Sequence, residues 1–275
     1  MPVTVPAPRF DLALTLASGQ FFRWTREADG AFAVVRGPVL FRVRQEGDVL
    51  HAEGADADLL REFFALDHDV APVERALRRD PALRPAVAAC RGMRILRQDP
   101  WECVAAFITS IASNIPRITR NVADIAAAAG KPLELGTSKA YAFPRPGDMP
   151  DEGALRKMKL GFRATYLARA ARLAHSGLLD DVARLPYEDA KRALMVLPGV
   201  AEKVADCVLL FAYGRLNAFP VDTWIRKATL RLYFRNRRVP DRALRAFAAE
   251  RWGDHAGYAQ QAIYHWSRTT KVLGR

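Results

Sequence analysis

The chain has 275 residues, of which 50% are apolar and 26% are charged, which is enough for one or two compact domains with a real hydrophobic core. This composition excludes a disordered tail or a fibre. The excess of Lys and Arg gives a formal net charge of +12, and such an excess attracts polyanions, with nucleic acid as the leading class of partner. An Arg-rich proteome would produce the same charge, so charge alone does not establish that partner.

Cysteine usage argues against a metal or redox cofactor. Cys90, Cys103 and Cys207 are too few and too scattered for a disulfide framework or a four-thiolate zinc or iron–sulfur site. We therefore expect no cofactor and a reducing compartment. The N-terminal residues lack the pattern of a signal peptide, and no apolar run approaches the ~20 residues that span a bilayer. These features predict a soluble intracellular protein without a membrane partner, cytoplasmic and nucleoid-associated if the source is prokaryotic.

The N-terminal region has the pattern of an antiparallel sheet. Four β-rich runs, at residues 21–24, 31–37, 39–45 and 48–54, are separated by turn dipeptides within the segment 10–54. From residue 57 onward, apolar residues recur at helical spacing nearly to the end. The turn-rich segment 140–150 separates two helical parts. The expected fold is therefore α+β, with an N-terminal antiparallel β-containing domain with flanking helices over residues 1–95 and a two-part all-α domain over residues 96–275.

The segment 190–213 is typical of a helix–hairpin–helix. The pattern predicts that one helix ends at Val196, that a Pro198–Gly199 turn follows, and that a second helix begins near Ala201. The first backbone amides of that second helix, with the positive end of its dipole, suit a DNA phosphate of any sequence. An ordinary corner between two helices would look the same.

Lys203 lies just inside the second helix of this hairpin. The positive end of the helix dipole disfavours an ammonium group and so favours the neutral amine, which is a nucleophile. A solvated surface lysine or a phosphate contact is the alternative.

Asp222 lies before the helical run that begins at residue 223, in the position of an N-cap. Capping alone would explain this residue. A capping carboxylate is also fixed in orientation, however, and in ionised form it can stabilise an oxocarbenium-like sugar.

The run 197–212 followed by 219–225 resembles the helix–hairpin–helix glycosylase superfamily, and within it the 8-oxoguanine DNA glycosylases. The segments 16–24, 96–119, 160–171 and 255–264 are similar to parts of the same family, in the same order. The resemblance covers nearly the whole chain. It implies that residues 96–275 form a helix–hairpin–helix glycosylase domain and that the partner is double-stranded DNA containing an oxidised purine. One subunit suffices for base flipping, so we expect a monomer.

The resemblance also implies a mechanism. Lys203 corresponds to the lysine that attacks the sugar C1′ of the flipped nucleotide, expels the base and leaves a Schiff base that can undergo β-elimination. Asp222 corresponds to the carboxylate that supports this chemistry. The chain is thus expected to be a bifunctional DNA glycosylase and AP lyase.

Four residues correspond to those that hold the damaged base. Gly19 matches the glycine whose carbonyl accepts a hydrogen from N7 of the oxidised purine, and a plain turn glycine is the alternative. Gln260 matches a side chain that hydrogen-bonds the Watson–Crick edge. Tyr264 replaces an aromatic residue that stacks on the base, and Cys207 matches a cysteine that flanks it; core packing would explain either equally well.

Other residues correspond to contacts with the rest of the DNA. Arg117 and Arg163 match arginines that read the cytosine left behind, although either could contact phosphate instead. Phe162 takes the place of an aromatic wedge beside that cytosine. The expected DNA-binding residues are Asn114, Arg117, Phe162, Arg163, Gly199, Val200, Ala201 and Trp224. The carbonyls of Met195, Leu197 and Val200 are a candidate site for a structural cation with no chemical role.

Three positions depart from the family. Ala112 stands within an asparagine run of the eukaryotic members, which predicts weaker discrimination of the opposite base. Trp224 stands where a histidine is often found, and indole cannot carry a proton. Ala201 replaces the second hairpin glycine, which an extended helix start accommodates.

Two alternatives remain open at this point. A monofunctional alkylpurine glycosylase of the 3-methyladenine type keeps the aspartate but uses water in place of the lysine, and Lys203 and Gly19 argue against it. A non-catalytic DNA-binding protein would need only the hairpin and the positive charge, and the pairing of Lys203 with Asp222 argues against that. A metal-dependent nuclease is disfavoured because no carboxylate cluster with two-metal spacing stands out.

Overall fold

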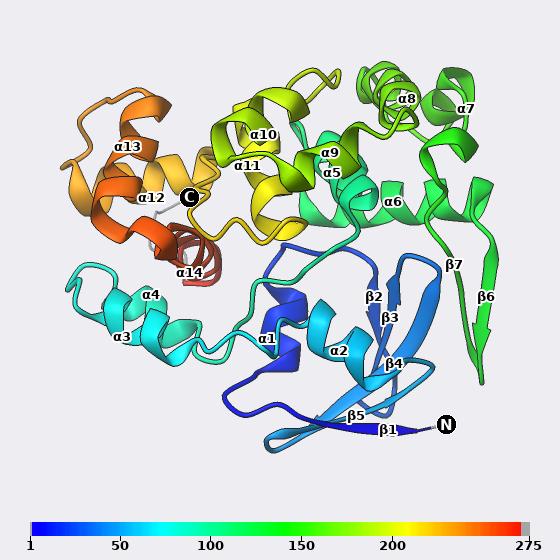
Figure 1. Ribbon diagram of the computed structural model, residues 1–275, viewed down its shortest axis with the longest axis horizontal. Helices are drawn as coiled ribbons and strands as arrows, with labels where there is room; N and C mark the ends of the chain where they lie inside the picture. The colour runs from blue at the N-terminus through cyan, green and yellow to red at the C-terminus, as the bar shows by residue number, and fades with distance from the viewer. Residues whose placement is uncertain (1, 271–275) are drawn as a thin grey trace.

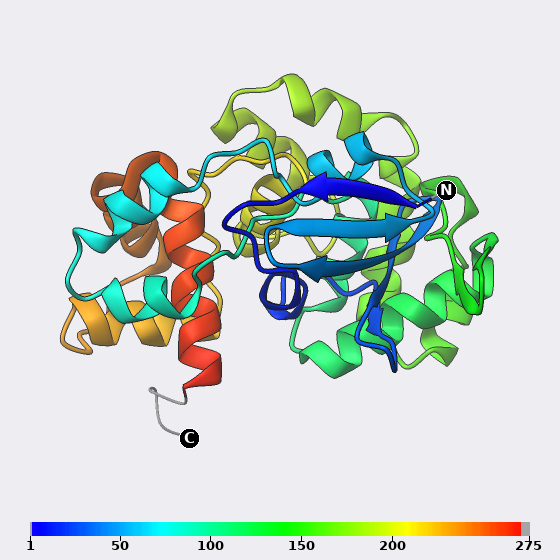
Figure 2. The same ribbon diagram turned by 90° about the horizontal axis from the view of Figure 1, so that it is seen from below.

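The computed structural model describes residues 2–270, in which a five-stranded antiparallel sheet lies beneath a helical body (Figure 1). The strand order in the sheet is β1-β5-β4-β3-β2, with β1 along its free edge (Figure 2). The pairing of Val43 with both Phe32 and Ala52 shows how β4 holds the centre of the sheet. The strands are β1 (Val3–Pro6), β2 (Trp24–Arg26), β3 (Phe32–Arg36), β4 (Val39–Glu46) and β5 (Val49–Glu53).

Helices make up most of the remainder, which confirms the predicted α+β class with a β-containing N-terminal part and a helical C-terminal part. Several begin with an aspartate whose carboxylate accepts a backbone N–H, as Asp99 does at α5 and Asp151 at α7. None of the helices between residues 2 and 270 is long and apolar enough to cross a membrane. The helices are α1 (Leu12–Ala17), α2 (Ala57–Phe63), α3 (Ala71–Arg78), α4 (Arg84–Ala89), α5 (Pro100–Thr109), α6 (Ile115–Ala129), α7 (Glu152–Lys157), α8 (Arg163–Ala174), α9 (Leu178–Arg184), α10 (Tyr187–Leu194), α11 (Glu202–Phe211), α12 (Thr223–Tyr233), α13 (Asp241–Trp252) and α14 (Ala256–Thr269), with short 3-10 turns at Pro146–Asp148 and Gly253–His255.

The N-terminal segment differs from its prediction in three places. The strand β1 and the helix α1 were not predicted, and the strand expected at residues 21–24 is a loop until Trp24. Phe21 and Phe22 are both buried, but Phe21 belongs to the core of the sheet and Phe22 to the core of the helices. The β-rich composition of residues 21–24 therefore predicted a strand, whereas the two phenylalanines belong to a loop that places one ring in each core.

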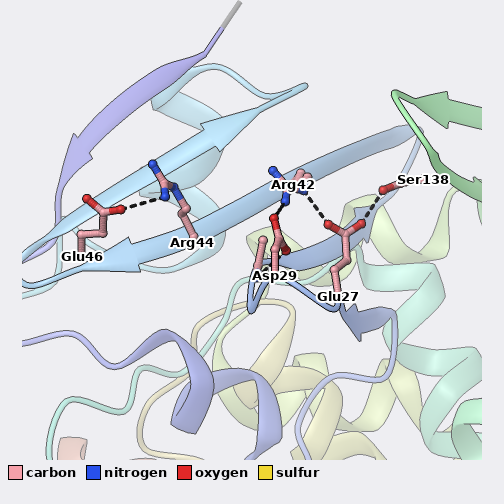
Figure 3. A network of polar contacts seen from close by, with 7 residues as sticks. Glu27, Asp29, Arg42, Arg44, Glu46 and Ser138 are labelled. Atoms are coloured by element: carbon pink, nitrogen blue, oxygen red, sulfur yellow. Dashed lines mark hydrogen bonds and ion pairs between the residues drawn. The ribbon is translucent and has the colours of Figure 1, made fainter.

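A second hairpin, β6 (Pro132–Leu135) with β7 (Ser138–Tyr141), was also missed, because this region was expected to contain only helices and turns. It packs against β4 and β3 of the large sheet. Figure 3 shows the polar contacts at this junction, where Ser138 donates to Glu27 and Arg42 binds both Glu27 and Asp29. Along β4, Arg44 pairs with Glu46 at 2.8 Å. The hairpin thus joins the helical part to the sheet.

Two hydrophobic cores underlie the architecture. The smaller lies between the sheet, α1 and α2, around Phe41, Phe63 and Phe64. The larger fills the helical body and includes Val73, Leu77 and other residues of α3 and α4. Figure 2 shows α3 and α4 beside the C-terminal helix α14. The predicted boundary at residue 95 assigns α3 and α4 to the N-terminal part, whereas the two cores group these helices with the C-terminal ones.

The predicted hairpin over residues 190–213 is present as α10, a turn and α11. The first helix ends at Leu194, two residues before the predicted end, and the second begins at Glu202. Gly199 has φ +85°, and a Cβ there would lie 2.9 Å from Cβ of Tyr166 on α8. Both the left-handed backbone and the close approach of Tyr166 require glycine at this turn. Ala201 has extended backbone, so alanine fits as expected.

Candidate active site

A cleft of about 750 Å³ lies where the loop after α1, the end of α5 and the helices α11, α12 and α14 converge. Segments far apart in the sequence meet here. The cleft brings together both predicted catalytic residues, all four predicted base contacts and part of the predicted DNA-binding set: Lys203, Asp222, Gly19, Cys207, Gln260, Tyr264, Asn114, Gly199, Ala201 and Trp224. Arg117, Phe162, Arg163 and Val200 are not among the residues that line it.

Lys203 reaches the cleft from the first turn of α11. Its Nζ donates a hydrogen bond to Oγ of Ser110 at 3.1 Å and lies 5.1 Å from the centre of the Phe107 ring. Both partners belong to the end of α5, which packs against α11. The amine is therefore held at the cleft instead of extending into solvent, as a nucleophile must be.

Asp222 caps α12, as predicted: its Oδ1 accepts the backbone N–H of Ile225 at 2.7 Å. Burial raises the pKa of Asp222, while the hydrogen bond from Ile225 and the positive charge of Lys203 act in the opposite direction. The carboxylate is thus fixed in orientation, partly desolvated and close enough to sense Lys203. Such a group can stabilise positive charge that develops on a sugar.

Gly19 and Tyr264 form one wall of the region that we call the base pocket, defined by Gly19, Cys207, Gln260 and Tyr264. Gly19 has φ +87°, and a Cβ there would lie 3.1 Å from both Cε1 of Tyr264 and Cδ1 of Ile115. The guanidinium of Arg268 lies 5.5 Å from the centre of the Tyr264 ring and donates to the carbonyl of Ala17. The loop that carries Gly19 is therefore clamped to α14.

Gln260 is buried on the same helix and has unused hydrogen-bonding capacity. Its Nε2 makes a long contact of 3.4 Å with the carbonyl of Pro220, and its Oε1 is buried without a partner among the described residues. An orphaned buried acceptor is costly, and it points to a ligand that donates a hydrogen bond there. The edge of a purine can supply such a donor.

Cys207 lies one helical turn after Lys203 and is buried in the wall of the cleft. Burial raises the pKa of its thiol to about 12, so the sulfur is protonated and unreactive at neutral pH. Cys207 can line the pocket as a small apolar surface but cannot compete with Lys203 as nucleophile.

Two residues predicted to contact the opposite cytosine differ in exposure. Phe162 is 49% exposed and lies edge-on to Tyr166, beside the hairpin, so it is available as a wedge. Arg163 is buried, and its guanidinium donates to the carbonyls of Ile111, Leu160 and Ala112. Arg163 can read a base only after giving up some of these bonds, so that role stays a prediction.

The remaining predicted DNA contacts surround the cleft. Trp224, in the first turn of α12, is 40% exposed, whereas Asn114 caps α6 by accepting the amide of Arg117. The side chain of Val200 is buried and its amide donates to the carbonyl of Leu197. That amide is therefore already used within the turn, which argues against the predicted phosphate contact through Val200.

The candidate cation site remains a prediction. It depends on the backbone carbonyls of Met195, Leu197 and Val200, of which that of Leu197 accepts the hydrogen bond from Val200. Among residues 2–270, no three His, Cys, Asp or Glu side chains are arranged so as to hold a metal ion together.

The structure also brings residues to the cleft that sequence reasoning missed. Ser110 and Phe107 contact the lysine amine, and Arg268 holds Tyr264. Ser110 lies 93 positions from Lys203, and its hydroxyl carries no sequence signal of its own. The spacing of Tyr264 and Arg268 on one helix face was visible, although nothing in the sequence tied it to function.

Comparison with known proteins agrees with this geometry. The family of 8-oxoguanine DNA glycosylase N-terminal domains matches residues 2–104. A probable N-glycosylase/DNA lyase of Methanothermobacter thermautotrophicus is 31% identical over 98% of this chain and 97% of its own length.

Two solved structures also match nearly the whole chain. MBOgg1 in complex with a low-affinity DNA ligand superposes with a TM-score of 0.94 at 34% identity, covering 98% of this chain and 96% of the other. The 8-oxoguanine glycosylase/lyase of Clostridium acetobutylicum, in complex with double-stranded DNA containing cytosine opposite 8-oxoG, gives 0.91 at 32% identity, with 96% and 93% covered. Because these relatives are at least 31% identical to this chain and cover at least 96% of it, the chain belongs to the 8-oxoguanine DNA glycosylase family of the helix–hairpin–helix superfamily.

Proposed function

We propose that the protein is a bifunctional DNA glycosylase and AP lyase that excises 8-oxoguanine from duplex DNA. The observation that carries this proposal is the position of the Lys203 amine: it is held at the wall of a cleft that also contains the carboxylate of Asp222 and the base pocket. The Methanothermobacter relative is named a probable N-glycosylase/DNA lyase, and the Clostridium 8-oxoguanine glycosylase/lyase was solved with 8-oxoG in its DNA.

The chemistry begins when the neutral amine of Lys203 attacks C1′ of the flipped nucleotide. The N–C1′ bond forms, the glycosidic bond breaks, and its electron pair leaves with the purine, which takes up a proton. Asp222 stabilises the positive charge that develops on the sugar. The C1′–O4′ bond then opens, O4′ receives a proton from the attached nitrogen, and a protonated Schiff base remains.

Strand cleavage follows from that Schiff base. Loss of a proton from C2′ sends its electron pair into a new C1′–C2′ enamine bond, and β-elimination then breaks the C3′–O bond and releases the 3′ phosphate. Water finally hydrolyses the Schiff base and restores the free amine. Lys203 is therefore required for both the glycosylase and the lyase step.

Recognition of the lesion is proposed to rest on the base pocket. The carbonyl of Gly19 would accept the N7 hydrogen that distinguishes 8-oxoguanine from guanine, and the unpartnered Oε1 of Gln260 would accept a hydrogen from the Watson–Crick edge. All of these groups come from one chain, which supports action as a monomer. In a prokaryotic cell the place of action would be the nucleoid.

The test is borohydride trapping on a duplex with a single 8-oxoguanine, comparing the wild type with Lys203→Gln. A covalent complex and strand cleavage that both depend on Lys203 are expected, with DNA affinity largely intact in the variant. Base release without an adduct would favour the water-using alkylpurine type of enzyme. Binding without any reaction would leave a different lesion or a non-catalytic DNA-binding protein.

A further inference from the structure

The hydrogen bond between Lys203 and Ser110 has a defined direction. Oγ of Ser110 lies 2.6 Å from the carbonyl oxygen of Phe107 and 3.1 Å from Nζ of Lys203. A carbonyl has no hydrogen to give, so the single hydroxyl hydrogen of Ser110 is donated to Phe107. The oxygen of Ser110 must therefore accept from Lys203, and it cannot donate to the amine.

This direction matters because the lone pair of the amine is what attacks C1′. A hydroxyl that donated to the neutral amine would occupy that lone pair and block attack. An oxygen that accepts instead holds one N–H and leaves the lone pair free. Since Lys203 and Ser110 both line the cleft, the free lone pair can be directed toward a flipped nucleotide.

The support for Ser110 is rigid. Ser110 is the C-cap of α5, and its amide donates to the carbonyl of Ala106 at 3.1 Å. The Phe107 ring, which lies 5.1 Å from Nζ of Lys203, stacks on Phe211 of α11 with ring centres 5.5 Å apart and planes 13° from parallel. The serine oxygen, the aromatic face and the lysine thus belong to two helices locked together.

We propose that Ser110 is a positioning residue for the reaction: it binds an N–H of Lys203 so that the amine lone pair points into the cleft. This proposal rests on the proposed function, in which Lys203 is the nucleophile. A free lysine side chain samples many rotamers, and fixing it near the reacting carbon removes that search from the chemical step. Ser110 touches neither the base nor the sugar in this scheme.

The central experiment compares Ser110→Ala and Ser110→Thr with the wild type. Single-turnover excision of 8-oxoguanine and borohydride trapping on a natural abasic-site duplex give the rate of the lysine step with and without a base. Ser110→Ala is expected to slow both about 10- to 100-fold, and Ser110→Thr, which keeps the hydroxyl, to stay within about 3-fold. In both variants, the affinity for a duplex with an inert tetrahydrofuran abasic analogue should differ from that of the wild type by less than about 2-fold.

Thr109→Val is the matched control. Thr109 donates to the carbonyl of Ala106 at 2.7 Å, just as Ser110 does to Phe107, but it lies outside the cleft lining. Thr109→Val removes a hydrogen bond from a hydroxyl to a helix carbonyl, one position before the bond made by Ser110. This variant is expected to have a lower melting temperature but unchanged rates of excision and trapping. A merely structural role for Ser110 would make the two variants behave alike.

Three outcomes would overturn the proposal: Ser110→Ala reacting within 2-fold of the wild type, Ser110→Thr being as slow as Ser110→Ala, or the loss appearing in DNA affinity instead of rate. If the wild type forms a covalent adduct on the abasic duplex but does not excise 8-oxoguanine, the proposed lesion is wrong. The role of Ser110 is then still tested by the rate of adduct formation on the abasic duplex. If the wild type forms no adduct on either duplex, Lys203 is not the nucleophile and both proposals fail.

Discussion

Gly19 and Tyr264 lie against each other in one wall of the base pocket, with 3.1 Å between Cε1 of the tyrosine and the position that a Cβ of Gly19 would occupy. Gly19 belongs to the loop after α1, near the start of the chain, and Tyr264 belongs to α14, near its end. Their contact means that the backbone of Gly19 is placed by α14, the helix that also carries Gln260. The proposed recognition of the lesion therefore depends on the packing of the loop after α1 against the last helix.

Gly19→Ala is expected to impair excision far more than strand cleavage. The added methyl meets Tyr264 and Ile115, and φ +87° disfavours any residue with a Cβ by about 1 kcal/mol or more. Excision of 8-oxoguanine should slow at least about 10-fold, whereas cleavage at a preformed abasic site needs no base in the pocket and should change by less than about 3-fold. Parallel single-turnover assays on the two duplexes measure this, and equal losses in both would remove Gly19 from base recognition.

Asp222→Asn is expected to slow chemistry about 100-fold or more, because the carboxylate charge is lost where positive charge develops. Asparagine caps a helix as well as aspartate does, so α12 should persist. The measurement is the single-turnover excision rate at saturating enzyme. Asp151→Asn, which alters an equivalent cap at α7 outside the cleft lining, is the control. A near-normal rate for Asp222→Asn would reduce Asp222 to a cap.

The same substitution should stabilise the fold at neutral pH. Burial raises the pKa of Asp222 above its ordinary value of 3.8, so keeping the group ionised costs the folded state more than the unfolded chain. Asparagine removes that cost, and the variant should melt at a higher temperature than the wild type at pH 7.5. As the pH falls below the raised pKa, the carboxyl becomes protonated in the folded protein, so the difference should shrink and then vanish below 3.8, where the unfolded chain is protonated as well. The melting temperatures of both proteins are measured from pH 4 to pH 8. A difference between them that stays constant over this range would contradict the prediction.

Discrimination of the opposite base is expected to be weak. Ala112, which stands where the eukaryotic members have asparagine, has only a methyl group, and the guanidinium of Arg163 is bonded to three backbone carbonyls. Excision rates opposite C, A, G and T should therefore fall within about 10-fold of one another. Ala112 has φ +47°, a conformation that asparagine tolerates better than alanine, so Ala112→Asn should keep the fold and increase the preference for cytosine. A strong cytosine preference in the wild type would refute the prediction.

The local signals in the sequence were sufficient for the catalytic elements. The Pro198–Gly199 turn and the cap at Asp222 each depend on residues a few positions apart, and the structure has both. The hairpin β6–β7 escaped prediction because its strands are only four residues long and none of their residues is fully buried. Its stability comes from packing on β4 and from Ser138 bonding to Glu27, 111 positions earlier. Contacts of that range leave no local pattern.

The candidate site also has residues that the sequence could identify and contacts that it could not. Lys203 and Asp222 could be assigned because the motifs around them resemble those of known enzymes. The direction in which Ser110 donates depends on a carbonyl at the end of α5, and the bonds of Arg163 depend on carbonyls in the loops after α5 and before α8. No periodicity or spacing reports which carbonyl lies within 3 Å of a side chain.

The contacts of α14 with the loop after α1 have a consequence for synthesis of the chain. Gln261 donates to the carbonyl of Ser18 and Arg268 to that of Ala17, across separations of 243 and 251 residues. A nascent polypeptide that has emerged only as far as α13 already contains the DNA-binding hairpin and the nucleophile, but it lacks half of the base pocket. The proposed damage recognition therefore cannot be assembled until α14 has emerged, because this helix supplies Gln260 and Tyr264 and also packs against α4 and α12 in the larger core.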